Sequence, residues 1–369
     1  MFKNAFRLPF RLLGIPVYLD ITFLVILPVL AWLIGSQMEA FVELLELPID
    51  AEPLLAGYMP YALGLAAALA LFASVVIHEL GHAVTARIYG VETEKITLWL
   101  LGGMAHFKEM PKQRGAEAVV AVAGPITSFL VGFFCWLILG FVPTEAGGLY
   151  FVVVYTLYMN VLLAVFNMIP AMPLDGGRVL RSLLALRMSH LRATQAAAGV
   201  SRFLAVALGI FGLLSFNIFL ILVALFVYMA VTAETQYALF TETLQRFSVD
   251  TLMTREVVTV DPEDTVEQVR SRMMSEARLA YPVQTSGGSI VGEVHLKHLR
   301  DVPPGRSVAE VMGAAPGTVE VKSGAQELFD RMIRDEEHRL LVVDESGAVV
   351  GIVTKTDLVR ALQVITVGG

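Results

Sequence analysis

The chain has 369 residues, of which 56% are hydrophobic, and a formal net charge of −7. This composition is too apolar for an ordinary soluble enzyme, and the negative charge argues against nucleic-acid binding. The charges are unevenly spread, because residues 203–233 contain none whereas charged side chains are dense after Arg246. The single cysteine, Cys135, excludes a disulfide framework and a thiolate metal site. The composition predicts a membrane-embedded part, residues 1–240, followed by a soluble part.

The N-terminal segment predicts a membrane span that is not cleaved. It is basic and then apolar, as a signal peptide is, but no small-residue cleavage site follows and the apolar run continues to Trp32. Stretches long enough to cross a bilayer lie at residues 15–36, 61–87, 116–142, 149–169 and 195–238. The uncharged core of the last stretch would reach ~46 Å as one helix. A break at residues 215–217 therefore predicts two crossings there, and six in all.

The distribution of Lys and Arg predicts the orientation of these spans. Basic residues precede the first span and follow the second and the fourth, whereas the acidic loop 37–59 contains neither Lys nor Arg. Because Lys and Arg concentrate in cytoplasmic loops, the N-terminus and the soluble tail are expected in the cytoplasm. The sequence thus predicts a multi-pass protein of the cell membrane.

The second span contains the segment SVVIHELGHAVTARI, residues 74–88. His78 and His82 are four residues apart and share one face of a helix, so that both imidazoles can bind one zinc ion while Glu79 handles a water proton. Ionisable groups at membrane depth are costly and are functional candidates for that reason. The alternative is that the two histidines form a polar patch between helices.

Two histidines do not complete a catalytic zinc site, which usually has three protein ligands and a water. The best candidate for the third ligand is Asp175, in the segment FNMIPAMPLDGGR, residues 166–178. Its neighbouring prolines and glycines predict irregular backbone, which could carry a carboxylate to a neighbouring helix. The second and fourth spans run in the same direction, so the two motifs are expected at a similar depth. Asp175 could instead serve only to form a turn.

Together, HELGH on the second span and NxxPxxPLDGGR after the fourth resemble the site-2 protease family of intramembrane zinc metalloproteases. The resemblance covers about residues 1–240. It implies that His78, His82 and Asp175 hold Zn²⁺ and that Glu79 is the general base. It also implies a substrate-binding role for Asn167, which could instead be a helix-end cap.

The segment ITLWLLGGMAHF, residues 96–107, matches the loop that follows the catalytic helix in this family. The resemblance implies a membrane-associated β-hairpin that pairs with an unwound substrate, where Gly102 and Gly103 permit close backbone approach. His106 is not a ligand in the family. Ser128 in AGPITS replaces an Asn of many members, which bears on packing or hydrogen bonding only.

The soluble tail contains two similar units, residues 247–302 and 303–369, which resemble a pair of CBS domains. The resemblance implies an adenine nucleotide (ATP, ADP or AMP) bound by Thr354 and Asp357 of the second copy, and association into a homodimer. The first copy has His295 and His298 where Thr and Asp are expected, so its site is doubtful. The pair could also be a dimerising module without a ligand.

The predicted fold is a polytopic α-helical membrane protein of about six transmembrane helices with a short β-hairpin, followed by a cytosolic α/β CBS pair. The predicted function is zinc-dependent intramembrane cleavage of transmembrane segments, modulated by nucleotide or dimerisation, with single-pass membrane proteins as substrates. The alternative is a CBS-regulated transporter or channel whose ion path uses the intramembrane His and Asp. An inactive protease acting as a scaffold is a third reading, disfavoured because all three presumed ligands and Glu79 are present.

Overall fold

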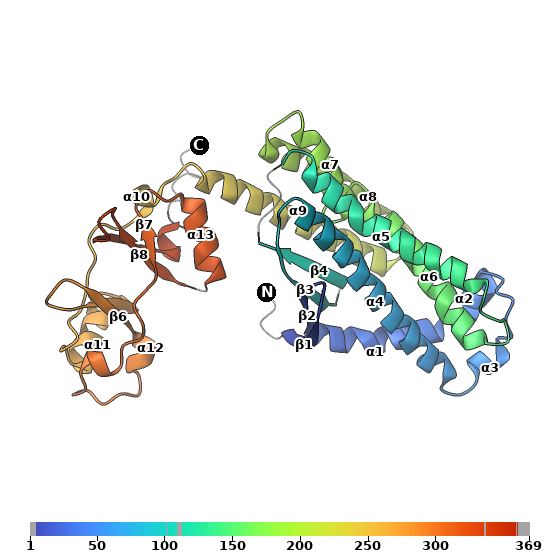
Figure 1. Ribbon diagram of the computed structural model, residues 1–369, viewed down its shortest axis with the longest axis horizontal. Coiled ribbons are helices and arrows are strands. Elements are labelled where there is room, and N and C mark those ends of the chain that lie inside the picture. The colour runs from blue at the N-terminus through green and yellow to red at the C-terminus, as the bar shows by residue number, and fades with distance from the viewer. Residues whose placement is uncertain (1–4, 101, 109–112, 336, 359, 361–369) are drawn as a thin grey trace. The chain divides into compact units, whose positions relative to one another are not determined.

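The computed structural model describes residues 5–100, 102–108, 113–335, 337–358 and 360 (Figure 1). The chain divides into two units, Met1–Gln236 and Tyr237–Gly369. The first contains most of the long apolar helices, and the second contains the repeated α/β part.

Five helices in the described part of the chain are long and apolar enough to cross a membrane. They are α4 (Met59–Ile88), α5 (Ala116–Leu139), α6 (Gly147–Asn167), α8 (His190–Leu214) and α9 (Ile218–Leu244). A sixth span is possible if α1 (Ile21–Ser36) and α2 (Met38–Leu44), which meet at a bend of 54°, form one crossing. Short helices α3 (Glu52–Leu55) and α7 (Asp175–Ala185) complete this unit. The expected polytopic helical fold is confirmed.

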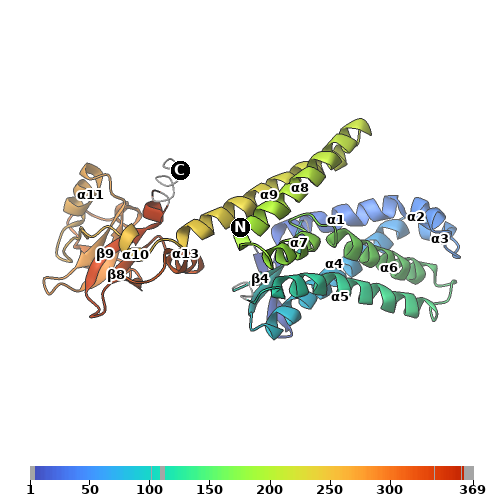
Figure 2. The ribbon, with the colours of Figure 1, turned by 90° about the horizontal axis from the view of Figure 1, so that it is seen from above.

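The predicted break near residue 216 is present. Helix α8 ends at Leu214 and α9 begins at Ile218, after Phe216 adopts a left-handed conformation with φ of 51°. The Asn217 side chain accepts the backbone N–H of Phe219 at 3.1 Å, which caps the new helix. Figure 2 shows α8 and α9 running side by side. Two helices of ordinary length therefore replace one overlong span.

The beginning of the predicted first span is a β-strand, not a helix. Strand β2 (Ile15–Asp20) precedes α1, and the Asp20 carboxylate caps α1 by accepting the N–H of Thr22 at 3.0 Å. Strand β1 (Ala5–Leu12), which was not predicted, pairs antiparallel with β2. The apolar N-terminal run is thus divided between a sheet and a helix.

The predicted hairpin belongs to a larger sheet. Strands β3 (Thr93–Trp99) and β4 (Gly102–Phe107) are antiparallel, as expected for a hairpin over residues 96–107. Strand β2 pairs with β3 in parallel, which gives the order β1-β2-β3-β4 and leaves β4 at an edge. Both β3 and β4 pack against α4. This contact brings an edge strand to the helix that carries the HELGH motif.

The second unit consists of two repeats with an offset of 59 residues. The first contains α11 (Val266–Ser275), β5 (Ala280–Gln284), β6 (Ile290–His295) and α12 (Leu296–Leu299). The second contains β7 (Thr318–Glu320), α13 (Ala325–Arg334), β8 (Arg339–Val343) and β9 (Val349–Thr354). The short helices α10 (Val249–Leu252) and η1 (Val308–Glu310) lie at the start of each repeat. Strands and helices recur in the order that the repeated sequence predicts.

The repeats exchange their first segments. Val249 and Met253, at the start of the first repeat, lie in a core with Leu328 and Leu340 of the second. Conversely, Val308 of the second repeat lies in the core of the first. Backbone hydrogen bonds also join the first segment of each repeat to the other repeat. Thr254 forms two with Ile352, and Gly313 forms two with Glu293. Neither hydrophobic core is complete without the other repeat.

Candidate metal centre and active site

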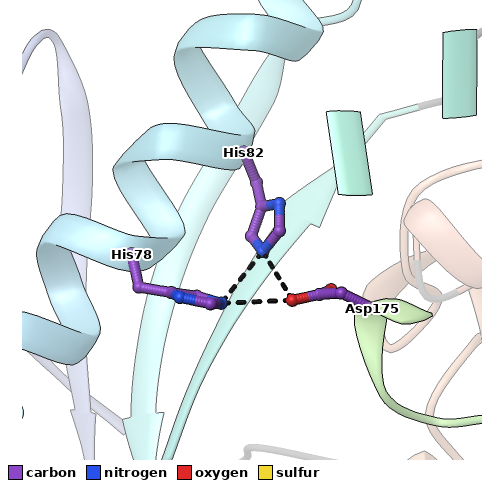
Figure 3. Close-up of side chains that lie close together, drawn as sticks. All are labelled: His78, His82 and Asp175. Carbon is purple, nitrogen blue, oxygen red and sulfur yellow. Dashed lines mark hydrogen bonds and ion pairs between the residues drawn. The ribbon is translucent and has the colours of Figure 1, made fainter. Parts of the chain in front are cut away.

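The two histidines of HELGH lie on the buried face of α4 and point to one place (Figure 3). His78 is 4% and His82 5% exposed. Their Nε2 atoms are 3.2 Å apart, as the spacing of one helical turn predicts. The side chains therefore present two ligand atoms to the same point.

Asp175 brings a third ligand atom to this point. Its Oδ2 lies 3.2 Å from Nε2 of His78 and 3.3 Å from Nε2 of His82. The carboxylate comes from a segment 97 residues further along the chain (Figure 3). The irregular backbone that the prolines predict extends only to Leu174, and Asp175 is the first residue of α7. The third candidate ligand is thus held at a helix start and not on a loop.

The other ring nitrogens of the two histidines are held by α5. His82 Nδ1 donates to the carbonyl oxygen of Val120 at 2.8 Å, so its Nε2 carries a free lone pair. His78 Nδ1 lies 2.8 Å from the hydroxyl of Ser128, which is fully buried, and when this nitrogen donates its Nε2 is free in the same way. Such outer bonds fix the tautomer and the orientation of histidine ligands.

A glycine on α5 leaves the space between the ligands open. A Cβ on Gly124 would collide with the ring of His82 and would lie 2.7 Å from Nε2 of His78. The ligands of a tetrahedral zinc ion, each at ~2.0–2.1 Å, lie ~3.3–3.4 Å from one another. The measured separations of 3.2–3.3 Å match that geometry, and two imidazoles with one carboxylate form a known catalytic zinc set. The site fits Zn²⁺ and leaves a fourth position for water or substrate.

Glu79 lies next to this cluster and contacts strand β4. Its Oε2 accepts the backbone N–H of Ala105 at 2.9 Å. A Cβ on Gly103 would lie 2.7 Å from Cγ of Glu79 and 2.8 Å from Cγ1 of Val75, so only glycine lets the strand approach α4 this closely. The carboxylate is thus placed between the histidines and an edge strand.

The predicted substrate residues occupy different surroundings. Gly103 contacts Glu79, as described, whereas Gly102 has a φ of +130° and open space where a Cβ would be. Asn167 is the last residue of α6, and its Nδ2 donates to the carbonyl oxygen of Leu163 in the same helix at 3.0 Å. This bond lies within the last turn of α6, as expected for a residue at a helix end. The role of Asn167 in binding substrate stays a prediction.

The predicted nucleotide residues lie close together at the end of β9. Asp357 Oδ2 accepts the N–H of Thr354 at 2.9 Å and its hydroxyl at 2.6 Å. In the first repeat the corresponding His295 instead contacts Glu293, with 2.7 Å between Nε2 and Oε2, and stacks edge-on against His298. The two repeats therefore differ at the same place in the fold.

Comparisons with known proteins assign the first unit. The model of peptidase family M50 matches residues 66–145 and 144–211. A zinc metalloprotease of Methanocaldococcus jannaschii is 32% identical over 361 residues, which are 96% of this chain and 96% of that protein. The chain belongs to peptidase family M50. This family includes the site-2 protease, so the protein is a metalloendopeptidase of a membrane-embedded zinc family, and the predicted family is confirmed.

Further proteins similar to this M50 metalloprotease match either nearly the whole chain or its first part. A candidate zinc metalloprotease of Mycobacterium tuberculosis is 32% identical over 96% of this chain and 92% of its own length. The solved structure of the site-2 protease of Methanocaldococcus jannaschii is 36% identical, covers 63% of this chain and 95% of that one, and has a TM-score of 0.44. The CBS domain model matches residues 249–305 and 308–364, which confirms the predicted CBS pair.

Several groups around the metal centre were not assigned from the sequence. Their positions depend on how α5 and β4 cross α4. They are the carbonyl group of Val120, the space left by Gly124 and the N–H of Ala105. The sequence predicts only a packing or hydrogen-bonding role at Ser128, and in the structure its hydroxyl lies 2.8 Å from Nδ1 of His78. The segment AGPITS could have predicted this crossing, because small residues in a helix allow a neighbouring helix to approach closely.

Proposed function

We propose that this M50 protease cleaves peptide bonds within the membrane, with Zn²⁺ held by His78, His82 and Asp175 and with Glu79 as general base. The observation that carries the proposal is the meeting of three ligand atoms, 3.2–3.3 Å apart, beside a carboxylate that bonds to an edge strand. A transporter whose ion path used the same His and Asp residues would have no need of Glu79 at an edge strand.

The catalytic chemistry follows from these side chains. When bound, Zn²⁺ polarises the scissile carbonyl group and lowers the pKa of water to about 7. Glu79 accepts the proton of the attacking water and then donates it to the leaving amine. The Ala105 N–H holds Oε2 of Glu79, which keeps the carboxylate between α4 and β4 during both transfers. Val120 and Ser128 keep the histidine rings in place.

The substrate is a transmembrane segment that is extended where it is cut. A helix engages its carbonyl groups in its own hydrogen bonds, so the scissile bond is exposed only after local unwinding. An extended chain can add to the outer edge of β4, which is the last strand of the described sheet and pairs with β3 on its other side. Gly102 and Gly103 lie on this strand, Gly103 beside Glu79 and Gly102 with open space around it, which supports a role for both in binding substrate backbone. Single-pass membrane proteins are the substrate class that fits.

The CBS pair binds an adenine nucleotide in the second repeat and modulates cleavage. Thr354 and Asp357 converge at the end of β9, which supports phosphate and ribose recognition there. The first repeat has two histidines at the equivalent positions, which supports a single nucleotide site per chain.

The helices of the repeats support a homodimer. Met274 of α11 and Ile333 of α13 occupy equivalent positions, 59 residues apart, and are 76% and 56% exposed. Apolar side chains exposed at both repeat positions favour burial against a second copy. The Lys and Arg distribution supports placement in the cell membrane with the N-terminus and the repeats in the cytoplasm.

The decisive experiment compares purified wild-type protein with Glu79→Gln in detergent. Gln keeps the size of the side chain and an oxygen for the Ala105 N–H, but it cannot accept a proton. We expect both proteins to bind one zinc per chain and cleavage of a single-span substrate to fall ~10²–10⁴-fold in the variant. Wild-type protein without zinc, purified in the absence of chelator, would favour the transporter instead.

A further inference from the structure

A buried guanidinium joins three helices outside the metal cluster. Arg181 of α7 is 4% exposed, and its Nη1 donates to Glu234 of α9 at 2.7 Å. Its Nε donates at 3.0 Å to Glu117, near the start of α5. Burying charges is costly even when they are paired, and apolar residues often give equal or greater stability. Stability is therefore a weak explanation for this network.

The network fixes the helix that begins with Asp175. Arg181 follows Asp175 by six residues, ~9 Å along the axis of α7 at 1.5 Å per residue. One residue later, the hydroxyl of Ser182 accepts the N–H of Ala118 at 3.1 Å, next to Glu117 in α5. Helix α7 is thus attached to α5 by two neighbouring side chains. The two helices lie next to each other in the fold (Figure 1). Because α7 is short, a shift or tilt at Arg181 moves Asp175 relative to the histidines.

Helix α9 contacts the chain on both sides of Asp175. Glu234 pairs with Arg181, which follows Asp175, and Val231 lies in one buried cluster with Met172, which precedes it. Both contacts lie within one turn of α9. The same helix ends at Leu244, which is buried in the core of the second CBS repeat. A displacement of α9 therefore acts on the chain both before and after Asp175.

We propose that Arg181 is a positioning residue that holds Asp175 at the metal centre, and that its ion pair with Glu234 makes the affinity for Zn²⁺ depend on α9. The inference rests on the metal site proposed above. It adds a route by which the element leading to the CBS pair reaches a metal ligand.

The test measures the Zn²⁺ dissociation constant of the full-length protein by competition with a chromogenic chelator. Removing the charge in Arg181→Met should weaken zinc binding ~10–100-fold, the range for outer residues of metal sites. Glu234→Gln, which leaves the pair with Glu117 intact, should have a smaller effect of the same sign. The double variant should match Arg181→Met alone, because Glu234 acts only through Arg181.

Matched controls separate positioning from folding. Arg178→Met removes a neighbouring Arg of α7 that has no ion pair among the described residues. Glu242→Gln removes a carboxylate of α9 whose one ion pair in the described part of the chain is with Arg246, four residues later. Both should bind zinc as wild type does. Arg181→Lys, which keeps the charge, should recover part of the affinity.

Two outcomes would overturn the inference in distinguishable ways. If Arg181→Met and Glu234→Gln lower the melting temperature but bind zinc with wild-type affinity, the network is structural only. If wild type and His82→Ala bind zinc equally, the metal site itself is wrong and the proposed function fails with it. Glu234→Gln keeps the test valid should Arg181→Met not fold.

Discussion

At the metal centre three side chains meet at one point, whereas in the CBS pair the contacts of the exchanged first segments occur twice. The cluster of His78, His82 and Asp175 occurs once in the described part of the chain, so no second site can substitute for it. In contrast, the contact of Gly292 with Met312 recurs between Gly351 and Met253, 59 residues apart in each case. A convergent site depends on every member at once, while a duplicated interface divides its stability between two copies. A single substitution at the metal centre should therefore abolish zinc binding, whereas one at the interface between the repeats should remove only part of its stability.

The largest effect is expected from Asp175→Asn. The amide is similar in size but has no charge, so the proposed site would lose its only anionic ligand. Zinc affinity should fall by more than the ~10–100-fold typical of outer residues, and cleavage should fall with it. Zinc content after dialysis measures this. Retention of wild-type zinc by this variant would remove Asp175 from the ligand set.

Gly124→Ala should abolish zinc binding without unfolding the protein. The new Cβ would collide with His82 and press on His78, in the space between the ligands. Alanine favours a helix over glycine by ~1 kcal/mol, which offsets part of the ~1–3 kcal/mol cost of overpacking, and a melting curve checks that the variant stays folded. Gly132→Ala is the matched control, because its Cβ would meet Val161 at an ordinary 3.4 Å. Equal zinc binding by both variants would contradict the geometry of the site.

Ser128→Ala should weaken zinc binding about tenfold, since Nδ1 of His78 would lose its partner. Thr232→Ala removes a hydroxyl that donates to the carbonyl oxygen of Tyr228 in the same helix, and it should leave zinc affinity unchanged. Chelator competition measures both. An unchanged affinity in Ser128→Ala would mean that packing alone orients His78.

The smallest effects are expected in the repeats. Gly292→Ala would place a Cβ 2.6 Å from the Met312 sulfur, and Gly351→Ala would place one 2.7 Å from that of Met253. Overpacking of this kind costs ~1–3 kcal/mol. The two variants should lower the melting temperature of the second unit equally, whereas Gly305→Ala, with open space around it, should not. Unequal shifts in melting temperature would show that the two repeated contacts do not contribute equally to stability.

The sequence predicts what depends on local geometry and misses what depends on helix crossings. The spacing of His78 and His82 is sufficient to bring them together, and Asp175 could be added because its span runs in the same direction. Gly124 and Arg181 could not be assigned, because their contacts join segments 40–65 residues apart. Strand β1 had a readable signal, since apolar residues alternate from Phe6 to Leu12, but the basic and apolar N-terminus suggested a span instead.

The exchange of first segments between the CBS repeats also determines the order in which the second unit can fold during synthesis. The core around Val260 and Val283 needs chain from residue 258 to residue 312, and is complete first. The core that receives Val249 and Met253 extends to Leu358, so these apolar side chains wait for more than a hundred further residues to emerge. At ~5–20 residues per second that interval lasts ~5–20 seconds. The start of the tail is therefore the segment most exposed to misassociation on the ribosome.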